Sequence, residues 1–177
     1  SVMRFDGSYD NYDIPIIPDI RTVFWVIRED PAATPGLRQL LGNSSGCDFY
    51  RGKFKRMWGT PGASAHITNG VTRIDGVPVD GTKTVVPTSF ALIDLVTTGN
   101  VSADRITEYS NVYNYVWHGE IAEIIIYNRA LSDLEREGVY RYLVDKYRGS
   151  PPGVLLQTPP EEGLFYPSGT VFDLLAT

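Results

Sequence analysis

The chain has 177 residues, of which 42% are hydrophobic and 12% are aromatic, and its charged side chains sum to −5 at neutral pH. This apolar content is high enough to bury a core, so the composition excludes a disordered chain, and the length predicts a single domain. The acidic balance argues against nucleic acid as a partner, because few cations are available to neutralise phosphate groups.

The sequence also argues against membrane insertion and against cysteine chemistry. Its longest apolar run, residues 23–27, is much shorter than the roughly 20 residues of a transmembrane helix. The single Cys47 has no partner for an internal disulfide or a cysteine zinc site, so we interpret it as a small packing residue.

Residues 1–116 carry the pattern of an all-β protein, with short apolar or alternating runs separated by Gly, Pro, Asn and Asp. Residues 21–27 (RTVFWVI) are rich in β-branched and aromatic side chains, and they predict a central strand buried on both faces. Residues 37–42 and 47–55 predict two strands joined by a turn at residues 43–46. A short basic cluster there predicts one solvent-exposed strand face, formed by Arg51, Lys53, Lys55 and Arg56.

The middle of the chain predicts a tight hairpin followed by a longer strand. In residues 71–79 (VTRIDGVPV), Asp75 and Gly76 are the residue types that a type I′ turn requires. Residues 85–97 predict the next strand, and residues 98–114 predict a polar connecting segment.

Residues 115–127 (YVWHGEIAEIIIY) predict another strand, with two faces that follow from a period of two. One face is expected to carry Trp117, Gly119, Ile121, Glu123, Ile125 and Tyr127. The other is expected to carry His118, Glu120, Ala122, Ile124 and Ile126. Both faces become apolar toward the end, as in an interior strand of a two-sheet sandwich that a further element covers.

One helix is predicted late in the chain. Ser132 is its expected N-cap, and Glu135 completes a capping box. Gly149 and the prolines after it end the helix. Its expected apolar stripe consists of Leu134, Val139, Tyr142, Leu143 and Tyr147.

The helix end divides the chain into two predicted parts. Residues 1–149 form the folded domain, and residues 150–177 form a Pro-rich linker followed by a segment that docks as a strand or begins another domain.

The strand and helix at residues 119–137 (GEIAEIIIYNRALSDLERE) resemble the last strand and short helix of laminin G-like domains, in bacterial and phage members of the concanavalin A-like lectin/glucanase superfamily. Three earlier segments resemble strands of the same family: Phe5-Asp6-Gly7, Phe24-Trp25 and Ile74-Asp75-Gly76-Val77. The resemblance implies an all-β, two-sheet antiparallel jelly-roll sandwich with one short C-terminal helix. It also implies a module that binds carbohydrate or protein within a larger surface protein, enzyme or virion component.

The sequence offers little for catalysis. A glycosidase needs two carboxyl groups that share a cleft, about 5 to 5.5 Å apart in retaining enzymes and about 6.5 to 9.5 Å apart in inverting ones. Glu120 and Glu123 are three residues apart in a predicted strand, so they are expected to point to opposite faces. No GxSxG motif is present, and His66, expected on a strand with an exposed ring, and His118 are the two histidines. We therefore predict a protein that is not an enzyme.

No cofactor is predicted, although laminin G-like domains can bind calcium through a few carboxylates and backbone carbonyls. Four aspartates are candidate ligands, but their interpretation as turn or polar strand residues is favoured: Asp75, Asp80, Asp94 and Asp104.

The candidate binding surface is a loop that concentrates tyrosine with polar side chains. Sugars bind such sets because an aromatic ring stacks on the apolar face of the sugar while polar groups satisfy its hydroxyls. The candidate residues are Asp104, Arg105, Tyr109, Asn111, Tyr113 and Tyr115, together with Trp58. Two alternatives stay open: Tyr113 and Tyr115 as strand residues that cap the core, and Trp58 as a residue of the core edge.

These observations favour a non-catalytic module that recognises a carbohydrate or another surface ligand, located outside the cell or on a virion such as a phage tail. A structural module that packs against sister subunits is the alternative. A glycan hydrolase or lyase is a third hypothesis.

Overall fold

The computed structural model describes residues 2–8, 10–44, 46, 48–108 and 115–148, and the backbone of residues 169–172. The predictions for Cys47, Tyr109, Asn111 and Tyr113 fall outside the described residues.

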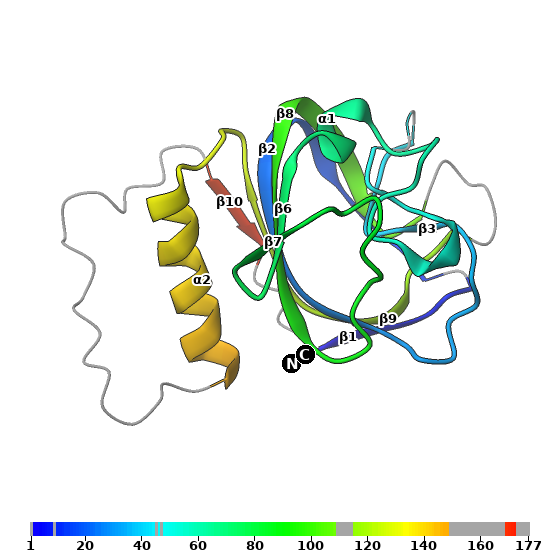
Figure 1. Ribbon diagram of the computed structural model, residues 1–177. Helices are drawn as coiled ribbons and strands as arrows, with labels where there is room; N and C mark the ends of the chain where they lie inside the picture. Colours follow the sequence, from blue (N-terminus) through cyan, green and yellow to red (C-terminus); the bar gives the residue numbers. More distant parts are fainter. Residues whose placement is uncertain are drawn as a thin grey trace.

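The fold is built on one curved antiparallel sheet (Figure 1). Its strands follow the order β1 (Met3–Asp6), β9 (His118–Tyr127), β2 (Tyr12–Glu29), β8 (Ala91–Ile106), β6 (Val71–Ile74) and β7 (Val77–Val79). Two more strands pair with this sheet, β4 (Leu41–Gly42) with β8 and β10 (Gly169–Phe172) with β9. A second, two-stranded sheet pairs β3 (Arg38–Gln39) with β5 (Tyr50–Arg51). The predicted all-β class is confirmed.

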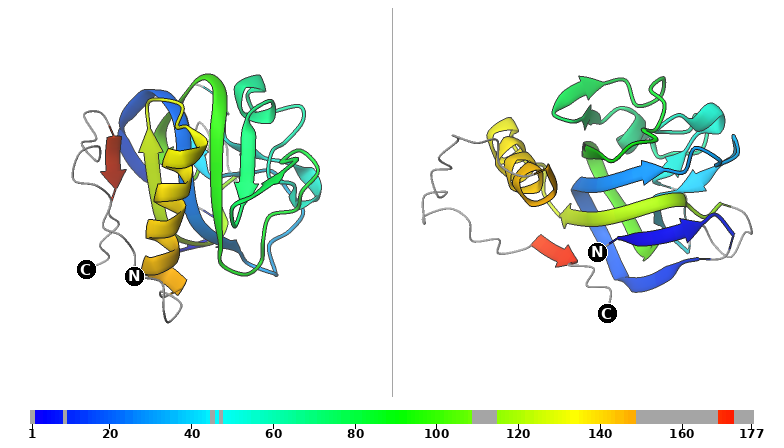
Figure 2. Two further views of the ribbon diagram at one scale, coloured as in Figure 1. Left: turned by 60° about the vertical axis from the view of Figure 1, so that its left-hand side comes forward. Right: turned by 90° about the horizontal axis from the view of Figure 1, so that it is seen from below.

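Both faces of the main sheet are covered, which gives a sandwich-like arrangement of layers. Figure 2 shows helix α2 (Asp133–Arg148) on one side and the segment that carries the 3₁₀ turn η1 (Lys53–Lys55) and helix α1 (Ala65–Thr68) on the other. The larger core lies on the second side and includes Trp25, Trp58 and Trp117. A smaller apolar cluster on the first side joins Phe24, Val26, Leu92 and Ile125 to Val139 and Leu143 of α2.

The prediction of a central strand at residues 21–27 is confirmed. Strand β2 pairs with β8 on one side and with β9 on the other, and it is buried without interruption from Thr22 to Ile27. Because both of its faces pack against other elements, the side chains in this stretch are large and apolar, apart from Thr22. Thr22 donates its hydroxyl to the carbonyl oxygen of Arg129.

The hairpin is also confirmed, because Asp75 and Gly76 both have positive φ angles, 50° and 79°, between β6 and β7. The prediction for the next strand is wrong in its extent. Strand β8 does not end at residue 97 but continues to Ile106, because β2 stays paired with it past an irregularity between Val96 and Val101.

A β-bulge in β9 overturns the predicted division of its faces. Val26 pairs with Glu123 while the next residue of β2, Ile27, pairs with Ile121, so Ala122 is an extra residue. As a result Ile121 lies in the larger core with Ile124 and Ile126. A period of two cannot describe a strand that contains an extra residue.

The same bulge corrects the prediction for Glu120 and Glu123. Each is the partner of a residue on the helix-facing side of β2, Arg28 and Val26 respectively. The two carboxylates therefore share a face of the sheet.

Helix α2 begins as predicted. The Ser132 backbone N–H donates to Oε2 of Glu135 at 2.8 Å, which is the return bond of a capping box. The predicted apolar stripe is partly wrong, because Val139 and Leu143 are buried whereas Leu134 is 83% exposed and Tyr142 is 51% exposed.

Arg136 takes the place of an apolar residue in the contact between α2 and the sheet. Its guanidinium donates through Nε to Oδ1 of the buried Asp94 at 2.6 Å. Arg73 donates to the same carboxylate from β6, through its Nε at 3.0 Å from Oδ2. Helix packing in this protein therefore depends on ionic contacts as well as on apolar burial.

Two predictions for the segment between β3 and β6 are wrong. Residues 53–55 form η1 rather than a strand, and Arg51 is buried instead of lying on a solvent-exposed face. His66 lies on α1, capped by the Ser64 hydroxyl, although its ring is exposed as expected.

Candidate binding cleft

A short arch of backbone leads from β5 through η1 to Arg56. The Gly52 N–H donates to the carbonyl oxygen of Arg56 at 2.9 Å and closes the arch at its base. Phe54 and Lys55 both have a φ of 60°. A positive φ is unfavourable for residues with a side chain, and for a bulky aromatic residue it is uncommon. The Phe54 side chain is nevertheless 74% exposed, so core packing does not explain its conformation.

A cleft of about 340 Å³ lies beside this arch. It is lined by Leu37, Tyr50, Lys53, Gly59, Thr60, Pro61 and Gly62, with a cis peptide bond between Thr60 and Pro61. The lining combines an aromatic residue, a cation and a stretch of backbone without large side chains. Such a mixture of apolar surface and a few polar groups is typical of small-molecule sites.

Glycine is required at two positions of the cleft. A Cβ atom at Gly62, where φ is +147°, would lie 2.5 Å from Cδ1 of Tyr50. A Cβ atom at Gly59 would lie 2.9 Å from the Cα atom of Gly52. The backbone therefore runs directly against the Tyr50 ring, and a side chain at either position would need the cleft wall to move.

Tyr115 adjoins this site from the other side. Its ring packs edge-on against Tyr50, with 5.8 Å between ring centroids and an interplanar angle of 89°. The Gln39 N–H donates to the Tyr115 carbonyl oxygen at 2.7 Å and fixes the backbone at this point. Of the residues predicted for binding that the structure describes, Tyr115 is the one that lies next to the cleft. The edge-on contact is also consistent with the alternative in which Tyr115 caps the core.

Buried charges anchor the arch to the central strand. Glu29, at the end of β2, forms an ion pair with Arg51, and both side chains are fully buried. The Lys55 ammonium lies 3.8 Å from the second oxygen of Glu29 and donates to the Pro31 carbonyl oxygen at 3.2 Å. Burial raises the pKa of Glu29 above its ordinary value despite the nearby cations, and burial lowers the pKa of Arg51.

Trp58 does not form an exposed platform. Its side chain is 1% exposed, and its indole N–H donates to the Thr72 hydroxyl at 2.8 Å. The ring packs against Trp25, with centroids 6.0 Å apart. The core alternative for Trp58 is therefore correct, because the hairpin and Gly81 lie over its ring.

Asp104 and Arg105 belong to strand β8 rather than to a loop, and they take part in a polar network. The Ser44 N–H donates to Oδ1 of Asp104 at 3.0 Å, while Arg105 lies 3.1 Å from Oε2 of Glu108 and 3.8 Å from Oδ1 of Asp13. Burial opposes ionisation of Asp104, but hydrogen bonds from Ser44 and Arg105 outweigh it and lower the pKa of Asp104. Neither residue lines the cleft.

The four aspartates considered for calcium are dispersed, and each accepts hydrogen bonds from protein donors. Asp75 binds Arg148, Asp80 binds Lys83, Asp94 binds Arg73 and Arg136, and Asp104 binds Ser44. Within the described part of the chain, no group of three or more His, Cys, Asp or Glu side chains is placed to hold a metal ion.

Glu120 and Glu123 share a face, but each is held by its own cation. Arg28 donates to Glu120 at 2.6 Å, and this hydrogen bond lowers the pKa of Glu120. The Lys146 ammonium donates to Glu123 at 3.2 Å, and the Glu123 residue is 2% exposed. Neither glutamate lines the cleft beside Tyr50 or the cavity at the end of α2, so the pair does not have the shared cleft that a glycosidase requires.

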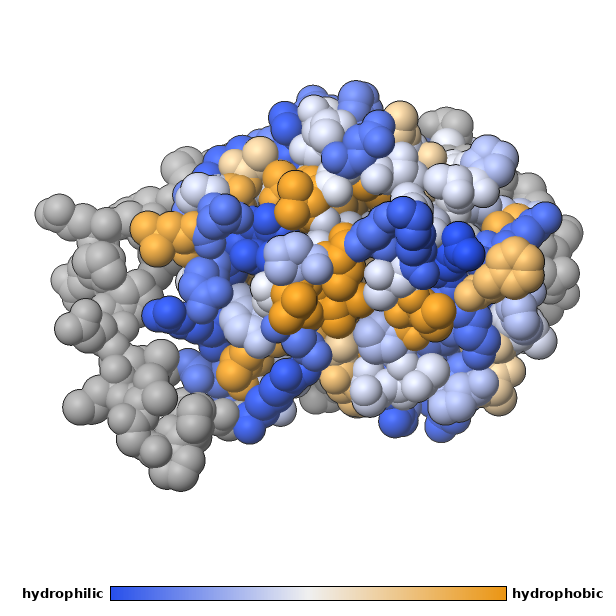
Figure 3. Space-filling view, viewed as in Figure 1, coloured by the Kyte–Doolittle hydropathy of each residue, from blue (hydrophilic) through white to orange (hydrophobic). Residues whose placement is uncertain are grey.

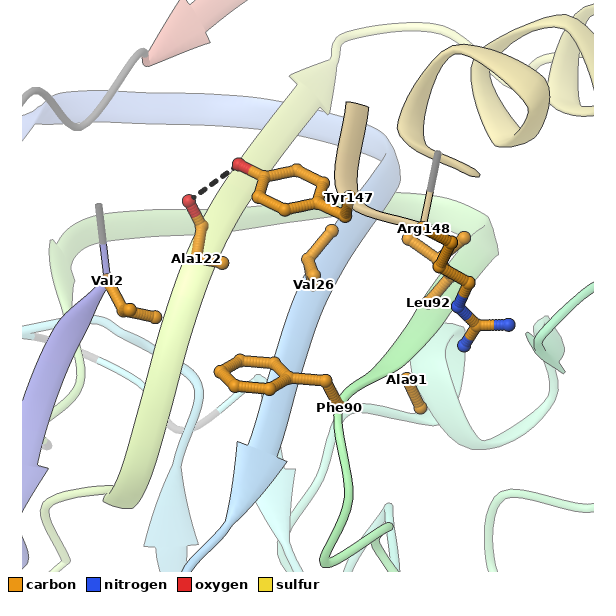
Figure 4. Close-up of a pocket in the computed structure, with 8 residues that line it drawn as sticks. All are labelled: Val2, Val26, Phe90, Ala91, Leu92, Ala122, Tyr147 and Arg148. Carbon is orange, nitrogen blue, oxygen red and sulfur yellow. Dashed lines mark hydrogen bonds between the residues drawn. The ribbon is translucent and has the colours of Figure 1, made fainter. Parts of the chain in front are cut away.

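A second cavity, of about 250 Å³, lies between the sheet and the end of α2 (Figure 4). Its walls are mostly apolar, and they include Val26, Leu92 and the exposed ring of Phe90. The Tyr147 hydroxyl, its main polar group besides Arg148, already donates to the Ala122 carbonyl oxygen at 3.1 Å. This cavity therefore has room for an apolar group, but it offers a ligand few polar contacts.

The sequence did not identify the cleft residues Tyr50, Lys53, Gly59 and Gly62, nor Phe54 beside them. One signal was present, an aromatic residue between two lysines (KFK) followed closely by a Gly-Thr-Pro-Gly run. The positive φ at Phe54, which prevents the alternation expected of a strand, has no such signal.

No helix among the described residues has the length and apolar character needed to cross a membrane. Comparisons of the chain with protein-family models, with curated proteins and with solved structures found no match.

Proposed function

We propose that the protein is a non-catalytic binding module that recognises a carbohydrate through the cleft beside Tyr50. The observation that supports this most is the exposed Phe54 ring, which the arch holds at a positive φ next to the cleft residue Lys53. Backbone strain that no packing explains is concentrated at functional sites. The cost of this conformation is then offset by a function of the ring in binding.

The chemistry of the site fits a sugar. Phe54 offers an apolar face on which a pyranose ring stacks. The cleft, at about 340 Å³, has the volume of a small-molecule site. The exposed side chains of Lys53 and Thr60 supply hydrogen-bond partners for hydroxyls. Tyr115 adds a second aromatic ring beside Tyr50 at this site.

We further propose a laminin G-like jelly roll as the finer fold and a place in a larger protein on a cell or virion surface. The support is the resemblance of residues 119–137 together with the antiparallel, sandwich-like arrangement of the strands. In this context the ligand is a surface glycan, and binding rather than turnover is the activity.

Binding of the labelled protein to a glycan array tests this function, with two phenylalanine variants as a matched pair. Phe54→Ala removes the proposed platform, whereas Phe90→Ala removes an exposed ring at the other cavity. We expect Phe54→Ala to lose binding and Phe90→Ala to keep it. Loss in Phe90→Ala alone would assign the ligand to the cavity beside α2, and an array without any bound glycan would reject the proposal.

A structural role in assembly is the second candidate, and one observation favours it. Val71, Val77 and Val85 are each more than half exposed, and Figure 3 shows apolar surface over the β6–β7 hairpin. Exposed apolar patches are typical of contact surfaces. Val77→Lys places a charge on this patch, and light scattering of both proteins would show whether it dissociates an oligomer.

A further inference from the structure

The charge of the chain is distributed very unevenly around the cleft. Between Asp48 and Asp75 the sequence contains no acidic residue, although the chain has 21 of them. The same stretch contains five basic residues: Arg51, Lys53, Lys55, Arg56 and Arg73. A protein with a net charge of −5 therefore carries a locally cationic segment, and this segment forms the arch and most of the cleft lining.

Most of these cations already have partners. Arg51 and Lys55 pair with Glu29, Arg73 pairs with Asp94, and Arg56 donates to the Thr82 carbonyl oxygen at 3.3 Å. Lys53 differs, because its ammonium group is exposed at the cleft and makes no ion pair or hydrogen bond with the residues that the structure describes. No carboxylate is among the cleft-lining residues.

We propose that the ligand of the cleft is an acidic saccharide, one that carries a carboxylate or a sulfate group, and that Lys53 binds this group. The inference rests on the proposed function, and it names the class of glycan. An anionic substituent placed at Lys53 gains a charge-assisted hydrogen bond, while the sugar ring that bears it stacks on Phe54. The surrounding acid-free segment adds a favourable field of longer range.

The charge balance of the site supports a negatively charged ligand. Glu29 neutralises one of the buried cations, and its side chain is fully buried, so it presents no negative charge to the cleft. A neutral glycan would leave Lys53 without a counter-charge, whereas an acidic glycan supplies one. Discrimination in favour of an acidic glycan therefore comes from the pairing of its anionic group with Lys53.

The first test is a glycan array that pairs acidic glycans with neutral ones of the same linkage. Calorimetry then measures binding of three probes: oligogalacturonate, a sulfated galactan oligosaccharide and a neutral galactan oligosaccharide. The unmodified protein is compared with Lys53→Gln and with Arg141→Gln, which removes the same charge from the outer surface of α2. Lys53→Gln is expected to weaken binding of the acidic probe about five-fold at low salt, and Arg141→Gln to leave it unchanged. Raising the salt concentration is expected to weaken binding of the acidic probe more for the unmodified protein than for Lys53→Gln.

Tighter binding of oligogalacturonate identifies a carboxylate as the recognised group, and tighter binding of the sulfated probe identifies a sulfate. Equal binding of the neutral and acidic probes, with loss of both in Phe54→Ala, would overturn the acidic ligand and keep the proposed function. Absence of binding to every glycan would overturn both. Equal effects of Lys53→Gln and Arg141→Gln would show that only the total charge matters and would remove Lys53 from the site.

Discussion

Glu29 and Arg51 form a fully buried ion pair that joins the end of the central strand β2 to the start of the arch. Lys55, at the other end of η1, lies near the second oxygen of the same carboxylate. Both ends of the arch are thus fixed to one side chain of the main sheet, so the position of Phe54 depends on residues that no ligand touches.

Removal of one member of this pair is expected to destabilise the fold strongly. Arg51→Met leaves the buried Glu29 carboxylate without its main counter-charge, which should lower the free energy of unfolding by about 3–5 kcal/mol near pH 7. Chemical denaturation measures this change. The double variant Glu29→Leu with Arg51→Met removes both charges and should recover most of the loss.

The effect of Arg51→Met should depend on pH in a direction that follows from Glu29. Burial raises the pKa of this carboxyl above its unfolded value, so its contribution to stability is fully present below the unfolded pKa and is lost as the pH rises through the folded pKa. Without Arg51 the folded pKa rises further. The deficit of the variant should therefore be smaller near pH 4 than at pH 7, and an equal deficit at both pH values would contradict this account.

Phe54→Gly should separate stability from binding. Glycine adopts positive φ readily, so the change relieves a strain of about 1–2 kcal/mol, partly offset by about 0.5–1 kcal/mol of lost chain entropy. We expect a melting temperature equal to or above that of the unmodified protein, together with loss of glycan binding. A marked fall in melting temperature would mean that the Phe54 ring packs on the protein rather than serving a ligand.

Gly62→Ala and Gly138→Ala form a matched pair with opposite expected signs. At Gly62 a methyl group meets the Tyr50 ring, and φ is unfavourable, so a loss of about 1–3 kcal/mol is expected. At Gly138, an exposed position of helix α2, no atom lies within 4 Å of an added Cβ, so a gain of up to about 1 kcal/mol is expected. Urea titration of both variants measures the change in the free energy of unfolding. An unchanged free energy in Gly62→Ala would show that the cleft wall moves freely.

The negative charge of Glu135 in the first turn of α2 should lose its stabilising effect in acid. A hydrogen bond from Arg129, with further bonds from Ser132, lowers the pKa of Glu135 to about 2. A depressed pKa contributes stability above the unfolded value of about 4.5, and this stability is lost as the pH falls toward 2. Glutamine keeps the capping-box hydrogen bond but loses the charge in the first turn, so Glu135→Gln should melt at a lower temperature at pH 7, by an amount that corresponds to about 0.3–1 kcal/mol. The two melting curves should converge near pH 2, and a constant gap would contradict the assigned pKa.

Local sequence patterns predicted the elements that local interactions determine. The apolar run of residues 21–27, the Asp75-Gly76 turn and the Ser132–Glu135 cap each depend on neighbours a few residues away, and the structure contains all three. They define the central strand, the hairpin and the helix on which the rest of the fold is assembled.

The errors lie where contacts distant in sequence decide the conformation. The extra residue Ala122 in β9 is visible only in its register with β2. Arg51 is buried because Glu29, far from it in the chain, provides the counter-charge. The positive φ angles of Phe54 and Lys55, which no local pattern signals, lie in the arch beside the candidate site at Tyr50 and Lys53, whereas the sequence pointed to Trp58 and Asp104.

The most direct test of the cleft as a glycan site is a two-dimensional amide NMR titration of the protein with the strongest saccharide found on the array. We expect shifts at the amides of Gly52, Phe54, Gly59 and Gly62, with the amides of Leu92 and Tyr147 at the other cavity unchanged. Shifts confined to Leu92 and Tyr147, or to the β6–β7 hairpin, would contradict this proposal.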